Sequence, residues 1–154
     1  MKKILIAVDD TKGAKAAFEM SGNICSCLRP EAIVLVYVEK FEGRSLIDEM
    51  LGVAEMSELR ESLKGTEIQA ALDKKANAIL DYYKKDLEAK GITSGIKTVI
   101  KSGHPADEIL EAAKEEGVDM IVIGSRGKRV SKFLMGSVSR EVANKSEIPV
   151  LLVK

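Results

Sequence analysis

The sequence has few of the residues that characterise disulfide scaffolds, metal clusters and disordered chains. Its 154 residues include two cysteines, one histidine and three prolines, and there is no tryptophan. Cys25 and Cys27 are two positions apart, so a helix would direct them to different faces, which disfavours a disulfide or a shared metal ion. Hydrophobic residues make up 45% of the chain, enough to bury a core. The length suits one domain, so we predict a single folded unit over residues 1–154.

The sequence also lacks a net charge and a long hydrophobic run. Lys and Arg together number 24, as do Asp and Glu, so no broad field attracts nucleic acid or anionic lipid. No apolar run approaches the roughly 20 residues of a membrane-spanning helix. The apolar stretch at residues 4–8 ends at Asp9 and Asp10 without the cleavage site of a signal peptide. We predict a cytoplasmic protein with no membrane span and no nucleic-acid partner.

Short runs rich in Val and Ile alternate with longer stretches that carry an apolar residue every three or four positions. This alternation predicts an α/β fold with a parallel sheet. Several of the short runs are continuously apolar, as is typical of strands covered by helices on both faces. The predicted strands are residues 3–8, 32–38, 96–100, 120–123 and 149–153, and the predicted helices begin near residues 12, 66, 105 and 137.

Local signals predict where these helices begin. Asp10 is expected to cap the first helix, and Thr66 with Gln69 has the spacing of a capping box. Pro105 suits the first turn of the third helix. Residues 41–64 fit the alternation least well, and their Leu and Met spacing predicts a helical insertion that packs on the core or a partner, or forms a lid over the site.

A glycine-rich segment follows the fourth predicted strand. It lies at the carboxyl end of that strand, where doubly wound sheets bind their ligands. Gly124, Gly127 and Gly136 lack side chains, so the backbone there is expected to adopt positive φ and to approach a phosphate. The last helix is expected to be capped by serine, with Ser137, Val138 and Ser139 in a first turn whose free amides favour an anion.

The charge of this segment agrees with a phosphate ligand. No acidic residue lies between Gly124 and Arg140, whereas the cations there are Arg126, Lys128, Arg129, Lys132 and Arg140. The alternative is a glycine turn followed by a solvated basic loop. The end of the first strand supplies the other half of the predicted site. Ala7 and Val8 could contact a base, while Asp9 could hold a ribose or a metal ion, or could cap the helix.

Taken together, these motifs resemble the universal stress protein family over nearly the whole chain. The matching segments are Ala7-Val8-Asp9, Val36-Tyr37-Val38-Glu39, Gly103-His104-Pro105, Gly124-Ser125-Arg126-Gly127 and Gly136-Ser137-Val138-Ser139. The resemblance implies an open five-stranded parallel sheet in the order 3-2-1-4-5, with helices on both faces. It also implies a homodimer joined through residues 149–153, and the family's ATP-binding branch, marked by G-x2-G-x9-G followed by Ser or Thr.

By that resemblance, the end of the first strand and Val38 surround an adenosine, and the glycine-rich segment holds the phosphates. The predicted nucleotide-binding residues are Ala7, Val8, Asp9, Val38, Ile123, Gly124, Arg126, Gly127, Lys128, Arg129, Gly136, Ser137, Val138 and Ser139. Here eight residues separate Gly127 from Gly136 instead of nine, which shortens the span by up to about 3.5 Å. ADP or AMP is therefore an alternative to ATP, with Mg²⁺ or Mn²⁺ at Asp9.

We interpret the chain as an adenine-nucleotide-binding regulatory protein of the stress response that acts as a dimeric switch for a partner the sequence does not identify. Enzyme motifs such as G-x-G-x-x-G and G-x-x-x-x-G-K are absent, and His104 is expected to be an exposed turn residue with no nucleophile to serve. Slow ATP hydrolysis or self-phosphorylation is one alternative. A dimeric interaction module that binds no nucleotide is the other.

Overall fold

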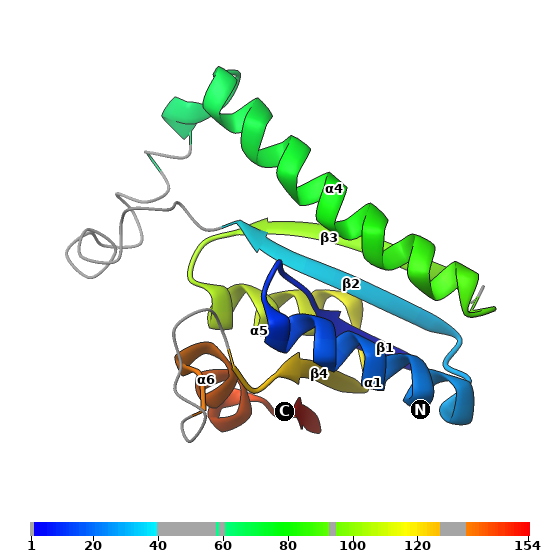
Figure 1. Ribbon diagram of the computed structural model, residues 1–154. Coiled ribbons are helices and arrows are strands. Elements are labelled where there is room, and N and C mark those ends of the chain that lie inside the picture. The colour runs from blue at the N-terminus through cyan, green and yellow to red at the C-terminus, as the bar shows by residue number, and fades with distance from the viewer. Residues whose placement is uncertain (1, 40–57, 59–60, 93–94, 127–134) are drawn as a thin grey trace.

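A five-stranded sheet forms the centre of the molecule in the computed structural model, which describes residues 2–39, 58, 61–92, 95–126 and 135–154 (Figure 1). Every strand pairs in parallel with its neighbours, in the order β3-β2-β1-β4-β5, as predicted. The strands are β1 Lys3–Ala7, β2 Ala32–Glu39, β3 Gly95–Ser102, β4 Met120–Gly124 and β5 Val150–Val153.

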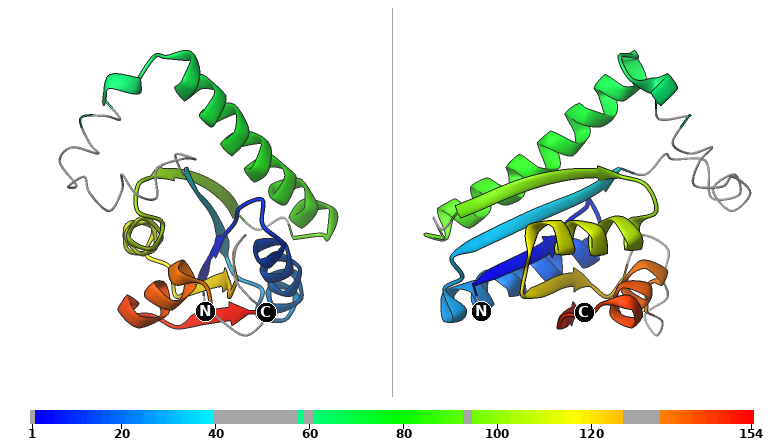
Figure 2. Two further views of the ribbon diagram at one scale, coloured as in Figure 1. Left: turned by 60° about the vertical axis from the view of Figure 1, so that its left-hand side comes forward. Right: turned by 180° about the vertical axis from the view of Figure 1, so that it is seen from behind.

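Helices cover both faces of this sheet. They are α1 Lys12–Leu28, α4 Glu67–Ala89, α5 Pro105–Glu116 and α6 Ser137–Lys145. Figure 2 shows α1 and α4 on one face, and α5 and α6 on the other. Successive side chains of β1 point to opposite faces, so Ile4 and Ile6 join the core under α1 and α4, while Leu5 joins the core under α5 and α6. β1, β2 and β4 are buried along almost their whole length, which explains their continuous apolar runs, whereas no residue of β3 is fully buried.

The start of α1 differs from the prediction. The N-cap is Thr11, whose hydroxyl accepts a hydrogen bond from the amide of Ala14 at 3.2 Å. Asp10 is exposed and lies 3.9 Å from the ammonium of Lys75, so its predicted role as the cap is wrong. The cause is local, because the Asp9 carboxylate accepts from the amide of Thr11 at 2.7 Å and holds a turn before the helix begins.

The two ends of α4 differ in burial. Its buried residues, Ala76, Leu80, Tyr83 and Leu87, lie in the later part of the helix. The segment 67–75 buries no residue, and Figure 1 shows this end of α4 standing away from the sheet. Thr66 caps the helix as predicted, accepting from the amide of Gln69 at 3.3 Å. Residues 41–57 and 59–60 of the predicted insertion lie outside the described residues, so that interpretation stays a prediction.

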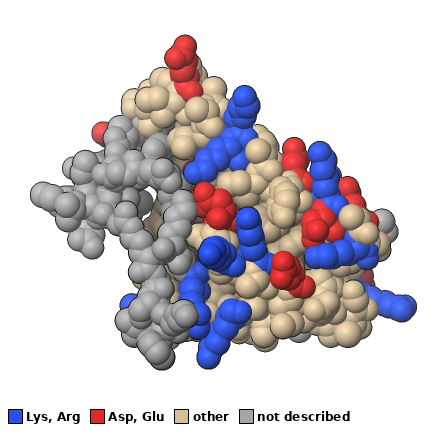
Figure 3. Space-filling view, in the orientation of Figure 1, with Lys and Arg blue, Asp and Glu red and all other residues tan. Residues whose placement is uncertain are grey.

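The two cysteines are free, with Cys25 buried and Cys27 exposed, so they face different environments as expected. In the described part of the chain, no helix has both the length and the apolar character needed to cross a bilayer. Figure 3 shows acidic and basic side chains interspersed over the face that α1 and α4 form, with no broad area of one sign.

Candidate functional site

The order of the strands defines one place where connections leave the sheet toward opposite faces. β1 and β4 are neighbours, with Ile6 opposite Val122. The chain leaves β1 to form α1 on one face and leaves β4 to reach α6 on the other, as Figure 2 shows. Ligands of doubly wound proteins bind beside the carboxyl ends of strands at such a switch point. The structure therefore brings the β1–α1 loop, residues 8–11, next to the segment that follows β4.

The β1–α1 loop is fixed by hydrogen bonds on several sides. The Val8 amide donates to the carbonyl of Val36 at 2.9 Å, which ties the loop to β2. The Asp9 carbonyl accepts from the hydroxyl of Tyr83 at 2.8 Å, and Asp9 Oδ1 accepts from the Thr11 amide. Asp9 Oδ2 makes no hydrogen bond to a described residue. One carboxylate oxygen of this half-buried residue thus remains for a ligand.

The main-chain amide and carbonyl of Ser125 join the end of β4 to two other elements. Its amide donates to the carbonyl of Val153 in β5 at 2.7 Å. Its carbonyl accepts from the Gly136 amide at 2.8 Å and from the Ser139 hydroxyl at 3.1 Å, both at the start of α6. This set of bonds fixes where α6 begins relative to the end of the sheet.

The first turn of α6 presents amide groups without a cap. Gly136 is the N-cap and has no side chain to accept a bond, so the expected serine cap is wrong. The hydroxyl of Ser139 bonds to the carbonyls of Gly136 and Ser125 instead. The Gly136 amide points inward, whereas the amides of Ser137, Val138 and Ser139 donate to no described residue. The positive end of the helix dipole lies at these three amides, which is the arrangement that binds anions.

The described glycines of the site act differently from the prediction. Gly124 and Gly136 do not adopt positive φ, so that expectation is wrong. Gly124 is instead required by packing, because a Cβ there would lie 2.4 Å from the carbonyl oxygen of Gly13 in α1. A Cβ on Gly13 would lie 2.0 Å from the carbonyl oxygen of Arg126. The main chains of α1 and the segment after β4 therefore touch directly.

The other predicted residues fall into two groups. Ala7, Val8, Val38 and Ile123 are buried at or just beyond the carboxyl ends of β1, β2 and β4, on the edge of the sheet where a base is expected. Arg126 is half-buried and Ser137 is exposed. Gly127, Lys128 and Arg129 lie outside the described residues, as does the shortened spacing between Gly127 and Gly136, so their roles stay predictions.

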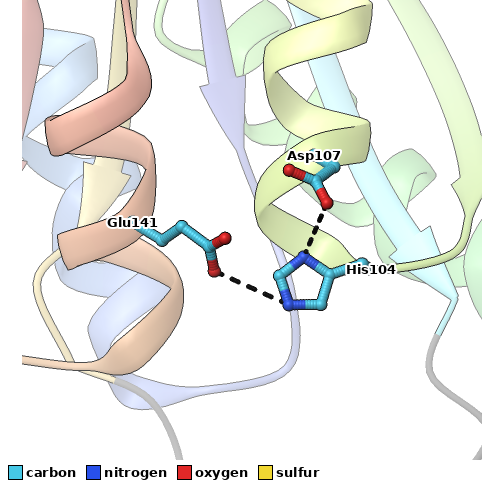
Figure 4. A group of neighbouring side chains, drawn as sticks. All are labelled: His104, Asp107 and Glu141. Carbon is cyan, nitrogen blue, oxygen red and sulfur yellow. Dashed lines mark ion pairs between the residues drawn. The ribbon is translucent and has the colours of Figure 1, made fainter. Parts of the chain in front are cut away.

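His104 takes part in an ion-pair network between α5 and α6. It is 57% exposed, as expected, and it lies between two carboxylates, with Nδ1 3.2 Å from Asp107 and Nε2 3.6 Å from Glu141 (Figure 4). The ammonium of Lys145 contacts both carboxylates, at 2.9 and 2.6 Å. Its hydrogen bond to Asp107 lowers the pKa of that carboxyl below the ordinary value. Lys145 neutralises part of the charge of both carboxylates, and all four side chains lie at the contact of α5 with α6, so we interpret the network as structural.

The sheet order, the helices on both faces and the switch point define an open α/β protein of the doubly wound class. The family model of the universal stress protein family matches residues 1–154, and this chain belongs to that family. Universal stress protein MJ0577 of Methanocaldococcus jannaschii is 34% identical over 157 residues, covering 99% of this chain and 94% of that protein. Universal stress protein YxiE of Bacillus subtilis is 31% identical and covers 99% and 98%.

Solved structures agree with the fold. The structure of MJ0577 has a TM-score of 0.75 at 31% identity and covers 99% of this chain and 95% of that chain. A universal stress protein family protein from Arabidopsis thaliana with AMP bound has a TM-score of 0.65 at 21% identity and covers 100% and 92%. The universal stress protein from Archaeoglobus fulgidus in complex with dAMP has a TM-score of 0.65 at 20% identity and covers 100% and 98%. The last two likenesses show the fold alone.

Proposed function

We propose that this chain binds an adenine nucleotide, namely ATP, ADP or AMP, between the β1–α1 loop and the start of α6. The adenosine lies against the ends of β1 and β2, and the phosphates lie at the first turn of α6. The observation that carries the proposal is the row of three amides at Ser137, Val138 and Ser139 that donate to no described residue. They adjoin a switch point of the sheet, so an anionic group there gains both hydrogen bonds and the helix dipole.

Two further observations support an adenine nucleotide as the anion. The fold accommodates AMP in the Arabidopsis thaliana protein and dAMP in the Archaeoglobus fulgidus protein. The residues of this chain at the same edge of the sheet are apolar, as a base requires, with Val8 and Val38 buried at the strand ends. The glycine and serine pattern of the family's ATP-binding branch favours ATP, whereas the spacing of eight residues between Gly127 and Gly136 keeps ADP and AMP in the proposal.

A divalent cation fits this site only in part. In the described residues, Asp9 offers one carboxylate oxygen and belongs to no cluster of three or more histidine, cysteine or carboxylate groups. Mg²⁺ is usually bound through one or two carboxylates together with phosphate oxygens and water. Asp9 could therefore contribute one ligand to Mg²⁺ or Mn²⁺ that a nucleotide brings with it. Such an ion would screen the phosphate charge.

The regulatory role belongs to the same proposal. The chain acts as a cytoplasmic, non-catalytic switch of the stress response that forms a homodimer through residues 149–153. β5 lies at an edge of the sheet, and its residues 150–152 are partly exposed, so a second copy can pair there. The only histidine of the sequence lies in the ion-pair network between α5 and α6, where both ring nitrogens face carboxylates.

Titration calorimetry on nucleotide-free protein tests the binding. The protein is unfolded, separated from small molecules, refolded, and titrated with ATP, ADP, AMP, adenosine and GTP. We expect binding of the adenine nucleotides, with adenosine weaker than AMP because it lacks the phosphate. A refolded protein that binds none of the adenine compounds overturns the proposal.

A substitution at the first position of α6 tests where the phosphates lie. Ser137→Pro deletes one amide donor, yet proline suits the first helical position, and the extended conformation of Gly136 suits a residue before proline. A charge-assisted hydrogen bond contributes about 1.5–3 kcal/mol, so ATP affinity should fall about 10- to 100-fold while adenosine affinity stays unchanged. Ser137→Ala keeps the amide and is the matched control for the hydroxyl.

A further inference from the structure

α4 contacts the β1–α1 loop through the exposed ion pair of Lys75 with Asp10 and through a buried tyrosine that the family pattern does not mark. Tyr83 is 2% exposed, and its hydroxyl donates to the main-chain carbonyl of Asp9 at 2.8 Å. The two residues are 74 positions apart in the sequence. The bond therefore joins α4, in the helix layer on one face of the sheet, to the loop in which the base and ribose are proposed to bind.

The position of this hydroxyl is set by packing. The ring of Tyr83 lies 4.5 Å from the ring of Phe18 in α1, centroid to centroid, and Leu80 and Leu87 are buried on the same side of α4. A ring held in this way cannot move its hydroxyl away without losing apolar contacts. Burial also raises the pKa of Tyr83, with the neighbouring charge of Asp9 adding to the effect, so the hydroxyl stays protonated and remains a donor.

The bond acts on a residue that is already held from another side. Asp9 Oδ1 accepts from the Thr11 amide, and the Tyr83 hydroxyl holds the Asp9 carbonyl. These two bonds together fix the peptide that follows Asp9 and the carboxylate that the proposal assigns to a ribose or a metal ion. Without Tyr83, no described residue of α4 bonds to this carbonyl.

We infer that Tyr83 is a positioning residue for the adenosine half of the site, an inference that rests on the proposed nucleotide binding. It holds the β1–α1 loop in the conformation that receives the adenosine, so that binding does not have to order the loop. Ordering a loop on binding lowers affinity, and a loop held in place avoids that loss. The role is separate from that of α6, because it concerns the part that AMP, ADP and ATP have in common.

The test is Tyr83→Phe, which removes the hydroxyl and keeps the ring. Affinity for AMP and for ATP should fall by the same factor, about fivefold, because one hydrogen bond no longer holds the loop. Tyr82→Phe is the matched control, since Tyr82 is the neighbouring tyrosine and is 60% exposed. Leu87→Val, at a fully buried position of α4, is a second control that lowers thermal stability and leaves the hydroxyl bond in place. Neither control should change affinity.

The outcomes separate this inference from the proposed function. Wild-type protein that binds no adenine nucleotide overturns both. Wild-type binding with unchanged affinity in Tyr83→Phe overturns the positioning role and leaves the proposed function intact. An equal loss of affinity in Leu87→Val shows that general destabilisation explains the effect, which also overturns the role. A loss confined to ATP, with AMP unaffected, places the effect at the phosphates and contradicts the inference.

Discussion

The two halves of the candidate site are built in opposite ways. In the β1–α1 loop, the Val8 amide bonds to β2, the Asp9 carbonyl bonds to α4, and the Thr11 amide bonds to the Asp9 carboxylate. At the start of α6, only the inward amide of Gly136 has a described acceptor, and the next three amides have none. The loop is thus held by bonds to β2 and α4, whereas the start of α6 keeps three amide donors.

This difference matches the chemistry of the two ends of a nucleotide. A base and a ribose are neutral and bind by shape, so a surface that is held firmly in place serves them. A phosphate is an anion that needs several donors, and an uncapped helix start supplies them. The main-chain contacts of Gly124 with Gly13, and of Gly13 with Arg126, connect the two halves.

The largest effect is expected where the halves meet. Gly124→Val places a side chain against the main chain of Gly13, which cannot move without shifting α1, so the free energy of unfolding should fall by about 3 kcal/mol or more. Urea denaturation measures the change. Gly95→Ala is the control, since its Cβ would have only ordinary contacts at 3.8 Å or more, and stability should change by less than about 0.5 kcal/mol. Normal stability of Gly124→Val would mean that the two halves are free to move apart.

A smaller effect is expected within the β1–α1 loop. Asp9→Ala removes the acceptor of the Thr11 amide and should cost about 1 kcal/mol in the free energy of unfolding. Asp9→Asn keeps a side-chain oxygen at that place, so most of this stability should remain. Thermal and urea unfolding of both variants give the comparison. If the two variants lose the same stability, the charge of Asp9 matters to the loop and the hydrogen bond does not.

At the start of α6, removing one side-chain hydrogen bond should lower the free energy of unfolding by less than it does in the β1–α1 loop. Ser139→Ala removes a buried hydroxyl that bonds to the carbonyls of Ser125 and Gly136. The Ser125 carbonyl keeps its bond from the Gly136 amide, so the expected loss is about 0.5 kcal/mol by urea unfolding. A loss above that of Asp9→Ala would reverse the comparison, because the start of α6 would then depend more on internal bonds than the loop does.

The smallest effect is expected at the amino ends of β1 and β4, the opposite end of the strands from the candidate site. The amides of Lys3 and Lys2 donate to the carboxylate of Asp119 and lower its pKa. A lowered pKa in the folded state means that this stability is present above the ordinary Asp pKa and is lost as the pH falls through the lower, folded-state value, so the window lies below about pH 4. In Asp119→Asn, the melting temperature should depend less on pH over that window.

Nucleotide affinity is the second measurement for Asp119→Asn. It should not change at pH 7, because Asp119 lies before β4 and at the amino end of β1, far along the strands from the carboxyl ends that form the site. A change in affinity would show that a loss of stability far from the site alters nucleotide binding. Effects of substitutions in the β1–α1 loop and at the start of α6 could then not be assigned to those segments.

The sequence predicted the elements better than the contacts between them. Short runs rich in Val and Ile predict all five strands, and the strand order follows from the family resemblance. The sequence predicts Asp10 as the cap of α1, whereas the structure has Thr11, because the sequence does not show that Asp9 uses its carboxylate on the preceding turn. Local propensity gives a helix start to within a few residues, and the choice among neighbouring polar residues depends on such bonds.

Two residues of the site were missed because their roles depend on distant partners. Gly13 sits in the first turn of a helix, where a glycine without an evident reason indicates a close approach of another chain segment. Tyr83 lies on the apolar stripe of α4, where a buried hydroxyl must find an acceptor. Both signals were present in the sequence. Neither identifies its partner, Arg126 in one case and Asp9 in the other, until the fold is known.

The main-chain hydrogen bonds of Ser125 bear on how the molecule can be regulated. Because its amide bonds to Val153 and its carbonyl bonds to the start of α6, Ser125 connects the edge strand β5 to the turn at which the phosphates are proposed to bind. Linkage of this kind is reciprocal. If a nucleotide bound at this turn raises the affinity of β5 for a partner, the partner must raise the affinity for the nucleotide by the same factor. A protein that docks on the β5 edge would therefore also change how tightly this chain binds nucleotide.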